Sequence, residues 1–348
     1  MNIKTLFKKR RSGSADKETN QRITTKTVEE VRRDVLDKGK KFKYPVQYEK
    51  HKVVINAIVV SVIGLIIAIV VAWWSLYRAN SDSLVLFKLT QVLPLSVGQI
   101  DGEPIKFSDY LAQYRSSTHY YQAKEDSLTD QDSINRLKQQ FRKQAFDNAT
   151  YVALANKLAR QHDITISKEE FEEDLNSKLS FDGSKMSQDA LDSIMRDNYG
   201  LDRGEYQKVF IHNPLLIRKV SFAIDEDAKQ LANTIKDELS LDGSNFQDVA
   251  EKHQANIILT ESELVKHANN DGGRAPVALG LSVGQVAGPI ESTSADGYYF
   301  IKLLAKDDST VSYQTILVSL SKFGKLVTEL SESGGLKVYA KLDIKPIE

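Results

Sequence analysis

The chain contains one long apolar run, VVINAIVVSVIGLIIAIVVAWWSLY, at Val53–Tyr77. No Asp, Glu, Lys or Arg interrupts it. At about 1.5 Å per residue, a helix of this length crosses a hydrocarbon core of roughly 30 Å. The Val and Ile content would favour a strand in water, and a core helix of a soluble protein is a second alternative. Because soluble helices rarely stay apolar on every face over such a length, we interpret the run as a transmembrane helix.

The two flanks of this run carry opposite charge. Residues 1–50 hold fifteen Lys and Arg against seven Asp and Glu, whereas the whole chain holds 47 of each. Trp73, Trp74 and Tyr77 cluster at the far end of the run, where amphipathic rings favour a membrane–water interface. The positive-inside rule then predicts a cytoplasmic N-terminus and an extracytoplasmic C-terminal part.

A cleaved signal peptide is the alternative explanation of the run. The basic segment that precedes it is far longer than the start of a signal peptide, and the run exceeds a usual signal core. Arg78–Ser81 (RANS) is a poor cleavage site. We therefore predict an uncleaved, single-pass anchor in the cell membrane.

The remaining composition is that of an ordinary globular protein, with 41% hydrophobic and 27% charged residues. The absence of cysteine excludes a disulfide framework, a thiol nucleophile and a Cys-based zinc site. The six histidines show no HxH or HExxH spacing, so we expect neither a metal nor a cofactor. The basic run Lys8–Arg11 could bind nucleic acid, but contact with anionic lipids is the favoured interpretation, and no nucleic-acid partner is expected.

The first half after the anchor is predicted to be helical, introduced by a small hairpin around Asp101-Gly102. Asp132–Gln161 carries an apolar stripe near the helical period. Ser167 and Glu170 form a capping-box pattern at the start of the next helix. Two further helices are predicted at Ser187–Tyr199 and at Asp202–Val220, the latter kinked or broken at Pro214.

The second half has a mixed pattern of helices and strands. Its predicted helices are Asp225–Leu239, Asn245–His253 and Lys322–Leu330. Its predicted strands are Arg218–Ile224, Asn256–Thr260, Gln285–Ile290, Gly297–Leu304, Val311–Leu320 and Leu336–Ile344. The stretch Asp271-Gly272-Gly273 lacks the context of a phosphate-binding loop and is expected to be a turn.

Two segments resemble the opening module of SurA-type chaperones. They are VGQIDGEPIKFSD at Val97–Asp109 and ARQHDITISKEE at Ala159–Glu170. The resemblance implies a mainly helical module that the end of the chain completes, with Leu336–Ile344 pairing with the strand at Val97–Ile100 or at Ile105.

The segments that follow resemble a parvulin-type (PpiC-like) prolyl isomerase domain. They are Asp225–His253 and LSVGQVAGPIESTSADGYYFIKLL at Leu281–Leu304. The family places one histidine on its first strand and another after Gly-Tyr on its last, where this chain has Tyr299. Val311–Val318 (VSYQTILV) also resembles the opening strand, with Thr315 at the position of the histidine. The resemblance therefore implies a degenerate domain whose isomerase activity is lost.

The sequence thus predicts an α+β protein in five parts. They are a basic, mostly disordered cytoplasmic tail (1–50), a transmembrane helix (51–79), a SurA-N-like helical chaperone module (80–220), a degenerate parvulin-like α+β domain (221–307), and a C-terminal strand–helix–strand that packs on the chaperone module (308–348).

The resemblances imply a membrane-anchored extracytoplasmic chaperone or foldase that binds unfolded or newly exported polypeptides. An active peptidyl-prolyl cis-trans isomerase using Tyr299, and a non-catalytic membrane scaffold, are the alternatives. A tyrosine group with little periodicity is the candidate client-binding surface: Tyr110, Tyr114, Tyr120 and Tyr121. The sequence leaves the oligomeric state open.

Overall fold

The computed structural model describes residues 25–43, 47–124, 130–181, 184–241, 245–342 and 344. The chain divides into two compact units, Met1–Val70 and Val71–Glu348. The basic run Lys8–Arg11 lies outside the described residues.

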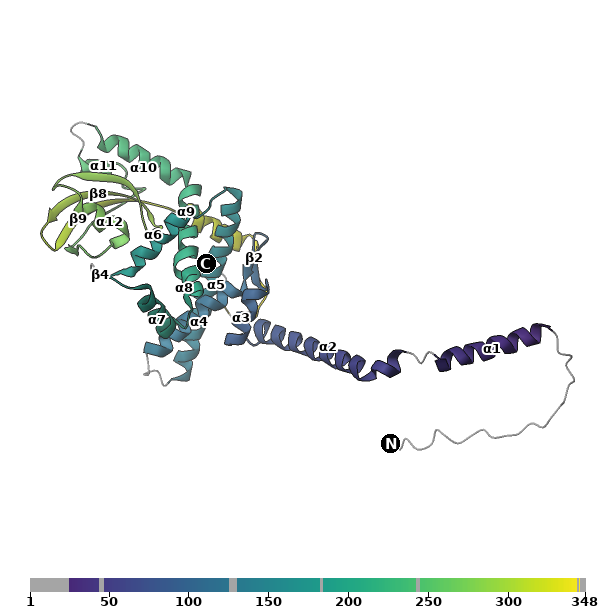
Figure 1. Ribbon diagram of the computed structural model, residues 1–348. Helices are drawn as coiled ribbons and strands as arrows, with labels where there is room; N and C mark the ends of the chain where they lie inside the picture. The colour runs from purple at the N-terminus through teal and green to yellow at the C-terminus, as the bar shows by residue number, and fades with distance from the viewer. Residues whose placement is uncertain are drawn as a thin grey trace. The chain divides into compact units, whose positions relative to one another are not determined.

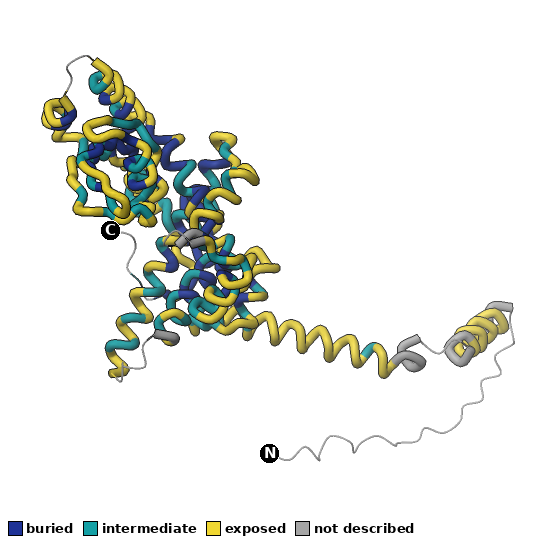
Figure 2. The backbone as a smooth tube through the Cα atoms, turned by 60° about the vertical axis from the view of Figure 1, so that its left-hand side comes forward, coloured by how far each residue is buried: buried dark blue, intermediate teal, exposed yellow. Residues whose placement is uncertain are grey.

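The first unit contains α1 (Thr25–Lys43) and most of α2 (Gln47–Tyr77). Within the part of the chain that the structure describes, Lys52–Tyr77 is the one stretch of helix long and apolar enough to cross a bilayer. Its side chains are exposed along nearly the whole helix (Figure 2). The sequence of the tail predicted to be mostly disordered is compatible with a short helix around Thr27–Asp37, and the structure has a helix of 19 residues there. The ion pair between Asp34 and Lys38, at 2.7 Å, lies at the i, i+4 spacing that supports a helix.

The second unit begins with a helical module, which we define as residues 71–224 together with 320–342. Its helices are α3 (Leu84–Val92), α4 (Phe107–Lys124), α5 (Gln131–Gln161), α6 (Lys168–Leu179), α7 (Gln188–Tyr199), α8 (Arg203–Tyr206), α9 (Asn213–Ile224) and α13 (Lys322–Glu332). Its strands are β1 (Ser96–Ile100), β2 (Glu103–Lys106), β10 (Leu336–Val338) and the short pair β3 (Ser180–Phe181) and β4 (Ser184–Lys185). The predicted capping box is confirmed, with reciprocal bonds between Ser167 and Glu170.

The end of the chain completes the helical module, as the sequence predicted. β10 lies antiparallel to β1, with Gly98 opposite Val338, and β1 pairs on its other side with β2. A Cβ atom on Gly98 would overlap the carbonyl of Lys337, so only glycine permits this close pairing. α13 packs on α9, and Val327 is fully buried there.

The segment Arg218–Ile224, predicted as a strand, is helical. α8, the π-helical turn Gln207–His212 and α9 follow one another with helical backbone at each junction. Pro214 does not break this run, because the preceding π-helical turn changes the hydrogen-bond register where proline lacks an N–H. Both sides of α9 are buried: Val220 lies in the core of the helical module, and Phe222 meets the ring of Tyr298 at 5.0 Å. Burial on two sides of the helix places large apolar residues at alternate positions, Val220, Phe222 and Ile224, and this alternation is the pattern that favours a strand.

The second part of this unit is a sheet domain, defined as residues 226–319. Its elements are α10 (Glu226–Leu239), α11 (Phe246–Lys252), β5 (Ile258–Glu261), β6 (Val265–Lys266), α12 (Arg274–Leu279), β7 (Val286–Glu291), β8 (Gly297–Lys306) and β9 (Thr310–Ser319). The antiparallel strand order is β5-β9-β8-β7, with β6 also on β9. Figure 1 shows α9 leading from the helical module towards this domain.

β9 corrects the predicted domain boundary at residue 308. The sequence predicts this strand in a C-terminal segment that packs on the chaperone module, but it lies inside the sheet between β5 and β8. Its alternate side chains enter the two cores of the sheet domain: Ile316 and Val318 face α10 and α11, whereas Val311 and Tyr313 face α12. Only α13 and β10 return to the helical module.

Candidate functional site

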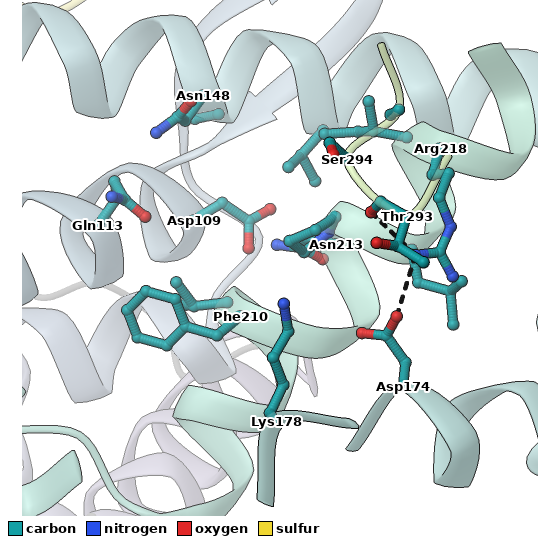
Figure 3. A pocket seen from close by; sticks show the side chains of 17 residues that line it. Asp109, Gln113, Asn148, Asp174, Lys178, Phe210, Asn213, Arg218, Thr293 and Ser294 are labelled. Atoms are coloured by element: carbon teal, nitrogen blue, oxygen red, sulfur yellow. Dashed lines mark hydrogen bonds and ion pairs between the residues drawn. The ribbon is translucent and has the colours of Figure 1, made fainter. Parts of the chain in front are cut away.

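A pocket of about 380 Å³ opens between the helical module and the β7–β8 turn of the sheet domain (Figure 3). α4, α5, α6, the π-helical turn and α9 form its walls on one side. The loop residues Thr293, Ser294 and Ala295 close it on the other. β7 and β8, which carry this loop, correspond to the strands predicted at Gln285–Ile290 and Gly297–Leu304, and they pair as an antiparallel hairpin.

The π-helical turn shapes the pocket wall. It contributes Phe210, and Asn213 follows at the start of α9 beside Pro214. A π-helical turn widens a helix locally and is often found at functional sites. Asn213 is almost fully buried although it is polar. Figure 3 shows its amide among the polar groups of the pocket.

The pocket combines apolar side chains with polar and charged groups. Asp109 of α4 forms an ion pair with Lys208 at 2.6 Å. Lys178 of α6 points into the open space, opposite Asp109 and Gln113 (Figure 3). Val152 and Leu215 supply apolar surface. A mixed lining of this kind can bury an apolar side chain while its neighbouring peptide groups find hydrogen-bond partners.

Arg218 joins the two sides of the pocket. Its guanidinium contacts Asp174 of α6 at 3.1 Å and donates to the carbonyl oxygen of Thr293 at 3.1 Å (Figure 3). One side chain of α9 therefore links a helix of the helical module to the loop of the sheet domain. The sequence places this arginine in a strand, whereas the structure places it in α9.

An aromatic row extends from the pocket along the helical module. The ring of Phe210 meets Tyr199 edge-on at 5.3 Å, and Tyr199 stacks on Tyr120 at 5.0 Å. Tyr120 is 39% exposed. Nearby, half-buried Tyr121 meets Phe141 at 6.0 Å. Two of the four predicted client-binding tyrosines thus lie at the accessible end of α4, while Tyr199 and Phe210 were not predicted as site residues.

The surface position predicted for Tyr110 and Tyr114 is wrong. Both are 3% exposed and stack on each other at 6.0 Å in the core of the helical module. Burial raises the pKa of Tyr110 above its usual value. The spacing of Phe107, Tyr110 and Tyr114 on α4 carries the signal that was missed, because residues three and four apart share one helix face.

Tyr299 lies inside a polar cluster rather than facing a cleft. Its side chain is fully buried on β8, and its hydroxyl bonds both carboxylate oxygens of Asp296, at 2.7 and 2.6 Å. The guanidinium of Arg274 lies 4.9 Å from its ring centroid. Arg274 also pairs with Asp271 at 2.7 Å, and Asp271 accepts a hydrogen bond from Tyr313 of β9.

Both tyrosines of this cluster keep their protons at neutral pH. Burial first, and then the hydrogen bond to Asp296, raise the pKa of Tyr299 to about 12. Burial and the bond to Asp271 likewise raise the pKa of Tyr313. A phenol whose pKa lies above 10 is neutral at pH 7, so both tyrosines act as hydrogen-bond donors in the cluster.

The cluster supports the loop that closes the pocket. The 3₁₀ turn Asp271–Gly273 accepts the N–H of Thr293 at the carbonyl of Gly272, at 3.0 Å, which confirms the turn predicted there. A Cβ atom on Gly272 would lie 2.8 Å from the Ser294 hydroxyl and 3.0 Å from the Tyr299 hydroxyl. The Tyr299 hydroxyl therefore packs against the turn at Gly272, and Tyr299 itself does not line the pocket.

Thr315, the other position compared with a family histidine, is also buried. It lies on β9, opposite Ile301 of β8, and is 1% exposed. Neither β8 nor β9 contains a histidine. Within the described ranges, no group of three or more His, Cys, Asp or Glu side chains is arranged to hold a metal ion.

Comparison with known proteins gives one family match. Residues 49–221 match the family described as the SurA-like N-terminal domain. This range includes the apolar part of α2, α3 to α8 and most of α9, and it ends before the sheet domain. No curated protein and no solved structure matches the chain.

Proposed function

Because the chain belongs to the SurA-like family through its residues 49–221, we propose that it is a membrane-anchored, extracytoplasmic chaperone for unfolded or newly exported polypeptides. The family supports a chaperone-type function, and the pocket supplies a place for a client segment. The observation that carries the proposal is the 380 Å³ pocket on the matched helical module.

The pocket and the aromatic row suit weak, sequence-tolerant binding. An extended client would place an apolar side chain against Phe210 and Val152, with peptide groups within reach of Gln113 and Asn148. Aromatic side chains such as Tyr120 offer a large contact area at a low cost in conformational entropy. A client would then extend from the pocket along Tyr199 to Tyr120.

Anchoring through α2 supports a role at the membrane surface. The stretch Lys52–Tyr77 is long enough to span a bilayer. Residues 1–50 are basic and the remainder is acidic on balance. This asymmetry supports a cytoplasmic N-terminus and an extracytoplasmic helical module.

The geometry around Tyr299 supports a loss of isomerase activity. Rotation about a peptide bond has a barrier of about 18–20 kcal/mol, and catalysis requires groups that contact the twisted amide. The hydroxyl of Tyr299 is bonded to Asp296 within the buried cluster, and Thr315 is buried on β9 opposite Ile301. A bound proline could not reach the Tyr299 hydroxyl without displacing the Asp271–Gly273 turn, which packs against it at Gly272.

Suppression of aggregation by the full chain in nanodiscs tests the proposal. The full chain is required because Leu76 and Tyr77 belong to the core of the second unit, so truncation at residue 80 would remove core contacts. Ala295→Trp would fill the pocket from its loop, and Val283→Trp places the same ring on an exposed site elsewhere on the sheet domain. We expect Ala295→Trp to lose most of the protection and Val283→Trp to retain it.

Two results would overturn the proposal. Equal protection by both variants would show that the pocket is not the binding site. No protection by the unaltered chain at molar excess would leave the membrane scaffold as the better explanation. Acceleration of prolyl isomerisation in a short peptide by the full chain would contradict the proposed loss of catalysis.

A further inference from the structure

The last turn of α2 is part of the folded second unit. Leu76 is 1% exposed, and the ring of Tyr77 meets Phe107 edge-on at 5.0 Å. The Tyr77 hydroxyl donates to the carbonyl oxygen of Ser96 at 2.9 Å, while its own carbonyl accepts the N–H of Lys341 at 2.9 Å. The end of the apolar helix and the helical module are therefore joined by packing and hydrogen bonds as well as by the chain.

α3, which follows this junction in the chain, presents an apolar face. Val85 is 78% exposed and Val92 is 81% exposed, and Leu84 and Leu93 are exposed as well. Phe87, on the opposite side, is buried in the core. Lys88 is the one charged residue of α3, and its ammonium bonds Asp202 and Glu205 of the helical module.

The returning end of the chain adds a second apolar segment at the same junction. Val338 and Tyr339 are exposed. The N–H of Tyr339 bonds the carbonyl oxygen of Val97 at 2.9 Å, two residues before the Lys341 contact with Tyr77. The side-chain amide of Asn80 donates to the carbonyl oxygen of Lys341 at 2.6 Å. The returning segment with its exposed apolar side chains is therefore tied to the end of α2, and α3 follows that end in the chain.

We propose that α3 and the Val338–Tyr339 segment rest on the lipid interface of the outer leaflet and seat the helical module on the membrane. The proposal rests on the proposed anchoring by α2. The exposed rings of Trp73 and Trp74 place the end of the span at interface depth. A short amphipathic helix beside such an anchor buries its apolar face among headgroups. Arg78 and Lys341, both exposed, are placed to meet lipid phosphates.

Lipid is the favoured occupant because the surface is continuous with a segment that needs lipid. The apolar side chains of α2 continue up to Trp74, and the chain reaches α3 after a short connection. In that connection the N–H of Ser81 bonds the carbonyl oxygen of Ser75 at 2.9 Å. A protein partner would have to cover α3 while leaving room for the bilayer at Trp73 and Trp74.

Site-directed fluorescence on the full chain tests the proposal, because the protein has no cysteine to remove. Single cysteines at Val85 and Val92 are labelled with an environment-sensitive probe in nanodiscs of phosphatidylcholine and phosphatidylglycerol. Lipids carry a spin-label quencher at the headgroup or deep in the acyl chain. Val62→Cys, within the span, reports anchoring, and Val283→Cys, an exposed apolar site on the sheet domain, is the matched control.

We expect headgroup spin labels to quench the probes at positions 85 and 92 several-fold more strongly than the probe at 283. If deep spin labels quench the probe at position 62 but headgroup labels give no excess quenching at positions 85 and 92, the contact of α3 with the lipid interface is contradicted. The membrane anchor itself would then still stand. Absence of quenching at 62 would overturn the anchoring itself. A probe at 85 that is shielded from water but not quenched by lipid would show that protein covers α3, which also contradicts the proposal.

Discussion

The Asp225 carboxylate accepts the backbone N–H of Ser321 at 2.7 Å, across 96 positions of sequence. The same oxygen accepts the N–H of Lys322 at 2.9 Å, and the other oxygen caps α10 through Ala228 at 3.2 Å. Asp225 is 3% exposed. One buried carboxylate therefore serves the first turns of both α10 and α13, where the chain leaves the helical module and where it returns.

We expect Asp225→Ala to lower the free energy of unfolding by about 2–4 kcal/mol, because it removes a cap and leaves one buried N–H group (Ala228) and two part-buried ones (Ser321 and Lys322) without this partner. Chemical denaturation of the full chain in detergent measures the change. Asp130→Ala is the matched control, since Asp130 caps α5 alone and is exposed; its cost should be about 0.5–1 kcal/mol. Equal costs would contradict the double role of Asp225.

Gly272 and Gly284 provide a second pair. Both have a positive φ, +68° and +85°, so alanine at either position is strained by its backbone. A Cβ atom on Gly272 would also meet Ser294 and Tyr299, whereas nothing lies within 4 Å of one on Gly284. We therefore expect Gly272→Ala to cost about 1–3 kcal/mol more than Gly284→Ala in thermal or chemical unfolding. Similar costs would show that the turn is not held against Tyr299.

The raised pKa of Tyr299 predicts a loss of stability at alkaline pH. In the unfolded chain a tyrosine releases its proton near pH 10, whereas in the folded protein Tyr299 keeps it up to about pH 12. The stabilising contribution is therefore complete below pH 10 and is lost as the pH rises from 10 to 12. Tyr299→Phe should reduce this slope by up to about 1.4 kcal/mol per pH unit. Denaturation at pH 9, 10 and 11 measures it.

Tyr339→Phe is the control for this pH dependence. Its hydroxyl bonds the side chain of Gln99 at 2.6 Å on the surface, outside the polar cluster. The slope of stability with pH in this variant should match that of the unaltered chain. A parallel decrease in both variants would show that the alkaline effect does not depend on the Tyr299 cluster.

Local patterns were sufficient to predict most elements of the fold. Apolar periodicity and caps predicted α5, α7 and α10, and the final strand does pair with β1. The errors occur where packing partners come from distant sequence. The end of α9, Arg218–Ile224, reads as a strand because two cores bury it. β9 is predicted in the wrong module, because one of its two ladder partners, β5, lies far earlier in the sequence.

The candidate site was less accessible to prediction than the fold. Its lining extends from Asp109 to Ala295 in the sequence, and only tertiary packing assembles it. The tyrosines of α4 suggest a client-binding surface, but Tyr110 and Tyr114, spaced on one face of the helix, are buried in the core. The hydrogen bond between Arg218 and the carbonyl oxygen of Thr293 cannot be predicted from the sequence of either segment alone.

Arg218 gives the last prediction, because it connects the helical module to the loop over the pocket. Arg218→Ala removes the contacts with Asp174 and with the carbonyl of Thr293. We expect faster amide hydrogen exchange in the β7–β8 turn and weaker protection of an aggregating client. Lys219→Ala is the matched control at the neighbouring position, since Lys219 bonds Glu170 and the carbonyl of Thr165, both within the helical module. It should leave exchange in the turn unchanged. Because both variants remove one cation from α9, faster exchange in both would show that charge, rather than the link to Thr293, orders the loop.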